Sequence, residues 1–460
     1  MTDAVSSSGA PAPAAHRLGY GVLWAYCLPL LGMNGMGILF SVYLMMYSTD
    51  VLLIAPAAMG VIFGIGRVWD AISDPLAGYM SDRSTAVRGR RRSWLYASAL
   101  PIGAAMVMLW SPPGLLTGAT LVVWVGFAYI LYETASTAFW VPHGALGMEL
   151  TPDYHERTRL FAYRHVVSSL GLGLGLGAVW LVRTAEQPRE MALFVSLVGG
   201  ALVAGMILFA AVRVPEREEF QGRGAVNIGR AFGDVFRNPH GRLLVFVYAI
   251  ETFGTASLGM LAPYVMKYVV NAPELTEVFI MMYVIPTLAF VPVWIWASKR
   301  VGKKRLWVFA MVATMLGYVT MFFVAEASYV AVFAVVSLLG IGSGCGAVVA
   351  PSVQADIVDY DEYMTGDRKE GAYVAVWNFL RKAAGGVTAM ATGFVLQAVG
   401  YDGEAEQQSA TTQTAIMALI GLLPAACYAI AIVMFSRFSL DEPEHRRIVT
   451  ALEARRGKLA

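Results

Sequence analysis

Two aspartates four residues apart lie inside an otherwise apolar stretch of this sequence. The segment reads GIGRVWDAISDPLAGYMSD and carries Asp70 and Asp74, with Arg67 one turn before them. On a helix this spacing places both carboxylates on one face, within reach of a single bound ion. Two adjacent carboxylates repel each other unless a cation or a proton lies between them, and hard cations such as sodium prefer oxygen ligands. The pattern predicts a titratable cation site.

A second segment supplies a positively charged partner. In GAYVAVWNFLRKAAGG, Arg381 and Lys382 lie midway along a run of apolar and small residues. A charged side chain at membrane depth costs about 2.5 to 3.5 kcal/mol on insertion scales, so it should face a partner or a cavity. Two aspartates, one lysine and one monovalent cation sum to neutral, which a low-dielectric site tolerates. The alternative is a purely structural network, in which the two aspartates pair with Arg67 and Lys382.

Further ionisable residues fall inside apolar runs: Glu133, His143, Arg164, His165 and Glu251. We expect each to face a partner or a cavity, for the same energetic reason. For the two histidines, a structural hydrogen-bonding role is favoured over proton relay.

The elements that must position these residues are membrane-spanning helices. The 460 residues are 57% hydrophobic and only 14% charged, with a mean hydropathy of +0.59, whereas an average soluble domain carries about 25% charge. Runs long enough to cross roughly 30 Å of hydrocarbon fall near 20–47, 51–81, 93–111, 116–148, 160–183, 190–213, 241–270, 276–298, 304–324, 328–355, 371–399 and 411–436. The sequence therefore predicts an all-α integral membrane protein with twelve transmembrane helices.

A long polar stretch divides these spans six and six. We predict a disordered cytoplasmic tail (1–18), an N-terminal six-helix bundle (19–213), a cytoplasmic central loop (214–240), a C-terminal six-helix bundle (241–437) and a cytoplasmic tail (438–460). Basic turns, GYMSDRSTAVRGRRRSW and ASKRVGKKRLW, follow the second span of each half, while alternate loops carry almost no basic residues. By the positive-inside rule, both termini and the basic loops face the cytoplasm.

Other classes of protein find little support in the sequence. A net charge of +2 with dispersed basic residues gives no case for nucleic-acid binding, and the three cysteines have no metal-ligand spacing. The six histidines form no H-E-x-x-H pattern and no G-x-S-x-G occurs, so we predict that the chain is not an enzyme. A sensor would need a signalling domain, for which the central loop and the tail are too short. Glycine clusters at 171–177 and 340–346 predict close helix packing rather than a phosphate loop.

Three motifs carry a specific resemblance. RVWDAISDPLAGYMSDRS with GRRRSW, then VPHGALGMELTPDYHERTRL, then QADIVDYDEYMTGDRKEGAY resemble the glycoside–pentoside–hexuronide:cation symporter family of the major facilitator superfamily. The resemblance covers nearly the whole chain. It implies two six-helix bundles that rock about a central cavity, in a bacterial inner membrane. It also implies a monomer that carries a small-molecule substrate with sodium or a proton and needs no other cofactor.

The resemblance assigns roles to particular residues. It implies a sodium or proton site at Asp70, Asp74 and Thr137, with Lys382 as its charge partner. It also implies that Arg164 contacts the substrate. We predict that the substrate-binding positions are Asn34, Trp140, Arg164, Glu251 and Trp377, and that the cytoplasmic gate comprises Asp82, Arg83, Arg90, Glu149 and Arg157. We expect cation binding to release Lys382 from the aspartates and to raise substrate affinity by thermodynamic coupling, before the halves rock and the gate contacts break.

The sugar site departs from the family pattern. An aspartate that grips sugar hydroxyls in the family falls on Trp140, a tryptophan falls on Gly144, and a helix-one aspartate falls near Asn34. Because carboxylates accept several hydroxyl hydrogen bonds at once, their loss disfavours an α-galactoside. The chain is also similar to the sodium-dependent lysophospholipid symporters of animals. An amphiphile is therefore the alternative to a sugar, glycoside or similar small organic solute.

Overall fold

Long helices make up nearly all of the structure. The computed structural model describes residues 18–151, 154–216, 233, 235–324, 328–366, 370–440 and 442–457, and these contain no β-strand. The first half comprises α1 (Tyr20–Ile38), α3 (Pro56–Arg83), α4 (Arg92–Trp110), α5 (Gly118–Glu149), α6 (Tyr154–Thr184) and α7 (Pro188–Arg213). Helix α1 continues without a break through η1 (Leu39–Tyr43), α2 (Leu44–Met46) and η2 (Tyr47–Val51).

The second half repeats this pattern of long helices. It comprises α9 (Pro239–Tyr268), η4 (Pro273–Leu275), α10 (Thr276–Ala289), α11 (Val291–Val301), α12 (Lys303–Val324), α13 (Tyr329–Thr365), α14 (Glu370–Ala398), α15 (Ala410–Met417), η5 (Ala418–Leu422) and α16 (Leu423–Ser436). Asn238 caps the start of α9, because its Oδ1 accepts hydrogen bonds from the backbone N–H groups of His240 (3.0 Å) and Gly241 (3.1 Å). The proline that follows the cap lacks the N–H that a first helical turn leaves unpaired.

Nine of the described helical segments are long and apolar enough to cross a membrane, and α10 with α11, which meet at a bend of 46°, make a tenth. The predicted span 276–298 is thus broken next to Phe290, where Pro286 and Pro292 interrupt the helical hydrogen bonds. Helices α3 (28 residues) and α14 (29 residues) have comparable length but lower apolarity, because they carry the charged residues of the predicted site. The count of twelve spans includes both and stays a prediction.

Apolar side chains cover the outside of both halves. Leu170, Leu174, Phe323, Leu338 and Val433 are all exposed by half or more. A protein surrounded by water rarely exposes so many large apolar side chains, whereas the outer surface of a protein in a bilayer must be apolar. The fold is therefore that of an all-helical integral membrane protein, as the composition predicts.

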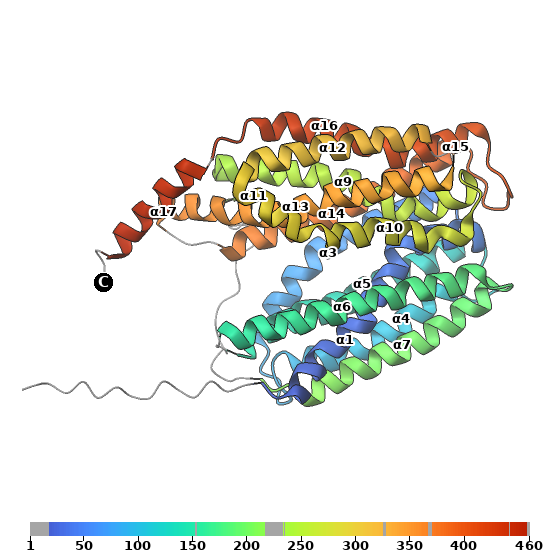
Figure 1. Ribbon diagram of the computed structural model, residues 1–460. Helices are drawn as coiled ribbons and strands as arrows, with labels where there is room; N and C mark the ends of the chain where they lie inside the picture. The colour runs from blue at the N-terminus through green and yellow to red at the C-terminus, as the bar shows by residue number, and fades with distance from the viewer. Residues whose placement is uncertain are drawn as a thin grey trace, which may run out of the picture.

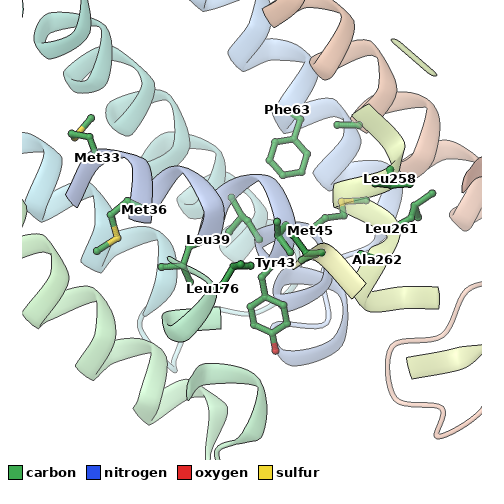
Figure 2. Close-up of a cluster of buried hydrophobic side chains, with 14 of the residues drawn as sticks. Met33, Met36, Leu39, Tyr43, Met45, Phe63, Leu176, Leu258, Leu261 and Ala262 are labelled. Carbon is green, nitrogen blue, oxygen red and sulfur yellow. The ribbon is translucent and has the colours of Figure 1, made fainter. Parts of the chain in front are cut away.

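The two halves meet along α3 and α14 and diverge toward one end. Figure 1 shows the helices close together at the end that carries α15 and farther apart at the end that carries α17 (Glu442–Gly457). At the closed end, η1 and α2 pack against α9. Figure 2 shows this contact, in which Met45 lies near Leu258 and Leu261 of α9.

Helix α17 falls within the predicted C-terminal tail and packs against α13. It buries Ile448 and Leu452, and the His445 Nε2 lies 3.0 Å from the Asp359 Oδ2. The predicted N-terminal tail lies outside the described residues, except for Leu18.

The two glycine clusters do provide close helix contacts. A Cβ on Gly175 would lie 2.4 Å from the backbone oxygen of Gly35 on α1, and a Cβ on Gly344 would lie 2.7 Å from that of Thr287 on α10. Glycine at these two positions lets backbones approach within a distance that any side chain would prevent.

Candidate cation and substrate site

Lys382 joins the two halves at the predicted cation site. Its Nζ donates a hydrogen bond of 2.6 Å to the Asp74 Oδ2 and lies 3.7 Å from the Asp70 Oδ2. The aspartates come from α3 in the first half and the lysine from α14 in the second. One ammonium group therefore reaches both carboxylates, which confirms that the two aspartates share a helix face. Helix α3 is continuous through Pro75.

The predicted threonine completes one side of this group. The Thr137 Oγ1 on α5 donates to the Asp74 Oδ1 at 2.8 Å, and the Ser73 Oγ donates to the Thr137 Oγ1 at 3.4 Å. Thr137 is buried, whereas the side chains of Asp74 and Lys382 are each 32% exposed. The group is thus enclosed on the α5 side and accessible at Asp74 and Lys382.

Arg67 forms a second ion-pair group on the other side of Asp70. Its Nη1 donates to the Asp70 Oδ2 at 2.7 Å, while its Nη2 donates to the Tyr129 hydroxyl at 2.9 Å and to the Glu133 Oε1 at 3.1 Å. Gly386 of α14 packs against the aliphatic part of Arg67, where a Cβ would lie 1.9 Å from Cγ. The structural network considered from the sequence is therefore present, and it includes Glu133 and Tyr129 of α5.

One oxygen of this network has no partner. Asp70 is 2% exposed, and its Oδ1 accepts no hydrogen bond among the described residues. A buried carboxylate oxygen without a donor costs about 1 to 3 kcal/mol or more, so it is suited to hold a cation or a proton. The described residues contain no group of three or more His, Cys, Asp or Glu side chains arranged around a metal. A sodium ion here would use Asp70, Asp74 and the hydroxyl of Thr137, all of them hard oxygen donors.

The predicted substrate residues do not form one group. Trp140 lies one turn after Thr137 on α5, and Trp377 lies five residues before Lys382 on α14, where its ring stacks on Tyr248 with centroids 4.3 Å apart. These two tryptophans are near the ionic network along their own helices.

The other three predicted substrate residues lie elsewhere. The Asn34 Nδ2 donates to the Ser168 Oγ at 3.3 Å, which links α1 to α6, and Arg164 lies on α6 beside Tyr26. Glu251 is 9% exposed and lies next to Trp307 of α12, in the interior of the second half.

The described gate residues bind within the first half. The Arg90 Nη2 donates to the Glu149 Oε1 at 2.8 Å, and Arg91 donates to the same oxygen at 3.2 Å. The guanidinium of Arg83 lies 4.2 Å from the ring centroid of Tyr79, one turn earlier on α3. The side chains of Asp82 and Arg157 lie outside the described residues. That the gate contacts break during transport stays a prediction.

A polar cluster that sequence reasoning missed joins the halves at their closed end. Asp50 of η2 accepts hydrogen bonds at Oδ2 from the Lys267 Nζ and from the Tyr268 hydroxyl, both at 2.7 Å. Its Oδ1 accepts from the Thr49 Oγ1 at 2.9 Å and from the Tyr401 hydroxyl. Burial raises the pKa of the Tyr401 hydroxyl, so this group remains a donor. We call Asp50 and its three partners from the second half, Lys267, Tyr268 and Tyr401, the Asp50 clamp.

The clamp has a signal in the sequence. Asp50 and Lys267 are lone charges at the ends of the first spans of the two halves, so they occupy equivalent positions of the internal repeat. A second ion pair joins the halves, with 2.8 Å between the Arg183 Nη2 of α6 and the Glu277 Oε2 of α10.

Solved structures share the fold of this chain. A nucleoside transporter, NupG, matches with a TM-score of 0.68 over 92% of this chain and 100% of its own, at 14% identity. A D-xylose–proton symporter matches with a TM-score of 0.67, at 12% identity, over 91% of this chain and 97% of its own. These likenesses show the fold of major facilitator transporters.

The sequence comparison is more specific than the fold. Residues 25–442 match the family described as MFS/sugar transport protein, and the chain belongs to that family. It is a multi-pass membrane transporter, and its homologues and structural neighbours are transporters rather than enzymes, as the sequence predicts.

The curated relatives include transporters named for a sugar and transporters named for a lysophospholipid. The isoprimeverose transporter of Lactiplantibacillus pentosus is 26% identical over 95% of this chain and 93% of its own length. The inner membrane symporter YicJ of Escherichia coli is 25% identical over 86% of each chain. The sodium-dependent lysophosphatidylcholine symporter 1-A of Danio rerio is 23% identical over 87% of this chain and 82% of its own. These relatives confirm the resemblance found from the motifs.

Proposed function

We propose that this protein is a cation-coupled symporter that carries a sugar, a glycoside or a similar small organic solute by alternating access. The observation that carries the proposal is the ionic network between α3 and α14. Its buried Asp70 oxygen has no donor among the described residues, and its lysine bridges the two halves. A cation bound there would change a contact between the halves, which is the requirement for coupling ion binding to rocking.

The charge of the network supports one monovalent cation. Asp70, Asp74 and Glu133 contribute three negative charges, and Arg67 and Lys382 contribute two positive charges, so the sum is −1. One sodium ion or one proton brings this to zero, the state that a low-dielectric site favours. We propose sodium or a proton as the coupling ion, held by Asp70, Asp74 and Thr137.

The relatives support a sugar or glycoside as the substrate class, and they support a bacterial inner membrane as the location. Trp140 and Trp377 offer aromatic faces on which a sugar ring can stack. With the basic loops facing the cytoplasm, both termini are cytoplasmic, and we propose that the protein acts as a monomer.

A lysophospholipid or another amphiphile is the second candidate. It is favoured by the similarity to a sodium-dependent lysophosphatidylcholine symporter. The family resemblance also implies that Trp140 replaces a carboxylate that binds sugar hydroxyls. Fewer acidic groups suit a substrate with a long apolar part.

Thermal stability of the purified protein tests the proposal. Sugars and lysophospholipids are scanned in sodium chloride and in choline chloride, because a ligand of the folded state raises the unfolding temperature. A compound that stabilises only with sodium establishes the coupling and the substrate class together. A repeat across pH covers a proton.

In vesicles, Asp70→Asn should abolish cation-driven uptake, while Asp402→Asn, in an exposed loop, should not. Uphill uptake by Asp70→Asn at the wild-type level would refute the cation site.

A further inference from the structure

We infer that Glu133 sets the net charge of the cation site and so determines how tightly the site binds its ion. This inference rests on the proposed function, because it concerns the ion that drives transport. Glu133 lies on α5, one turn before Thr137, and is 9% exposed. It accepts a hydrogen bond from one Nη nitrogen of Arg67, while the other Nη nitrogen donates to Asp70. Arg67 lies between Glu133 and Asp70, so Glu133 acts through Arg67 as a positioning and charge-setting residue.

Arg67 is shared between two carboxylates. One Nη nitrogen donates to Asp70 at 2.7 Å and the other to Glu133 at 3.1 Å, with the Tyr129 hydroxyl at 2.9 Å as a further acceptor. A guanidinium presents five donors in a rigid fork, so it can hold both carboxylates at once. Its single positive charge is thereby divided between Asp70 and a residue that lies outside the ion's coordination shell.

The consequence follows from counting charges. Without Glu133, the charges of Arg67 and Lys382 would fully balance those of Asp70 and Asp74, and the network would be neutral before any ion arrived. With Glu133 the network keeps a charge of −1. The third carboxylate therefore allows two aspartates to attract a cation although an arginine and a lysine already contact them.

The size of the effect can be estimated from Coulomb's law. Two carboxylates on one guanidinium lie roughly 6 Å apart, and an effective dielectric constant of about 20 to 40 suits a partly accessible site. Removing the charge of Glu133 should then weaken the binding of a monovalent cation at Asp70 by about 10- to 100-fold.

A charge-compensation cycle tests the inference. The half-saturating sodium concentration is measured from the thermal stabilisation of the purified full-length protein, with choline keeping the ionic strength constant. Glu133→Gln should raise this concentration by about 10- to 100-fold, and Arg67→Gln should lower it, since the network charges become 0 and −2. The double variant returns to −1 and should recover sodium binding close to that of the wild type. Glu133→Asp should also retain binding, and Glu190→Gln, on an exposed helix start, is the matched control.

A merely structural role predicts a different pattern. If Glu133 only held Arg67 in place, the double variant would bind sodium as weakly as Glu133→Gln or more weakly, and that result would overturn the inference. So would wild-type sodium affinity in Glu133→Gln. If Glu133→Gln does not fold, the double variant and Glu133→Asp decide the question by the same comparison. A wild-type protein that is not stabilised by sodium at all would instead refute the proposed sodium site, and the inference with it.

Discussion

Neutralising Asp50 should shift the protein from the arrangement seen here toward one that is closed at the opposite end. The carboxylate of Asp50 accepts hydrogen bonds from Lys267, Tyr268 and Tyr401, all from the second half. Asp50→Asn keeps the shape of the side chain but removes its charge and one of its two acceptor oxygens. The Asp50 clamp would weaken, whereas the helices of each half would keep their own packing.

The magnitude follows from the kind of contact that is lost. A hydrogen bond to a charged group contributes about 1.5 to 3 kcal/mol and one between neutral groups about 0.5 to 1.5 kcal/mol. Three such bonds would give a loss of about 3 to 4 kcal/mol, but the Lys267 side chain is 33% exposed and its share must be reduced for solvent screening. A change of about 2 to 3 kcal/mol remains, which shifts the conformational equilibrium by about 30- to 150-fold.

Distances between spin labels measure this shift. Cysteines introduced at two exposed positions carry the labels: Val87, in the basic loop after α3, and Val301, the last residue of α11. The three native cysteines are buried. When the halves close at the end opposite the Asp50 clamp, the distance between the two labels becomes shorter. The ratio of short to long distances should therefore rise in Asp50→Asn and stay unchanged in Asp402→Asn, which lies in the same loop as Tyr401. Equal distance distributions in Asp50→Asn and the wild type would refute the role of the clamp.

Three further predictions concern packing, the tail and the lysine. Gly175→Ala should lower the free energy of unfolding by about 1 to 3 kcal/mol, because the new Cβ would collide with a carbonyl oxygen of α1. Gly173→Ala should leave the free energy of unfolding unchanged, because a Cβ at that position has no atom within 4 Å. Thermal unfolding compares the two variants. His445→Ala removes the contacts with Asp356 and Asp359 of α13 and should speed hydrogen exchange in α17. The same change at the exposed Arg447 should not. Lys382→Ala should bind sodium more tightly but lose uphill uptake, measured by sodium titration and vesicle transport; retained uphill uptake would contradict its role in coupling.

The sequence predicted the site best where charged residues occurred in an apolar run at a spacing that fits one helix face. Charged residues in an apolar run are costly, so their presence alone indicated partners, and the four-residue spacing predicted one shared helix face. The structure confirms contacts between Asp74 and both Thr137 and Lys382. The composition likewise predicted an all-helical membrane fold, because a bilayer leaves few other ways to satisfy backbone hydrogen bonds.

The direction in which a side chain points from its helix was harder to predict than its position along the helix. Glu251 falls at membrane depth in the sequence, but only the packing of α9 shows that it points into the second half rather than toward Lys382. Glu133 was recognised as buried, yet its link to Asp70 through Arg67 requires the α3–α5 contact. The Asp50 clamp depends on contacts between segments more than 200 residues apart, which no local pattern encodes.

Lys382 connects the proposed ion site to the movement of the halves. Its ion pair with Asp74 is itself a contact between α14 and α3, so an arriving cation competes with the ammonium group for the same carboxylate. In the arrangement seen here, a cation must displace Lys382 from Asp74 before it can bind. In an arrangement where α3 and α14 have separated near these residues, the ion pair is already broken and nothing has to be displaced. The difference between these two binding free energies is the coupling free energy, because a ligand shifts an equilibrium only by its differential affinity for the two states. The Asp50 clamp holds the two halves together at the end that carries α15. The ionic network and the clamp therefore act on the same conformational equilibrium of the two halves, from different positions along their interface.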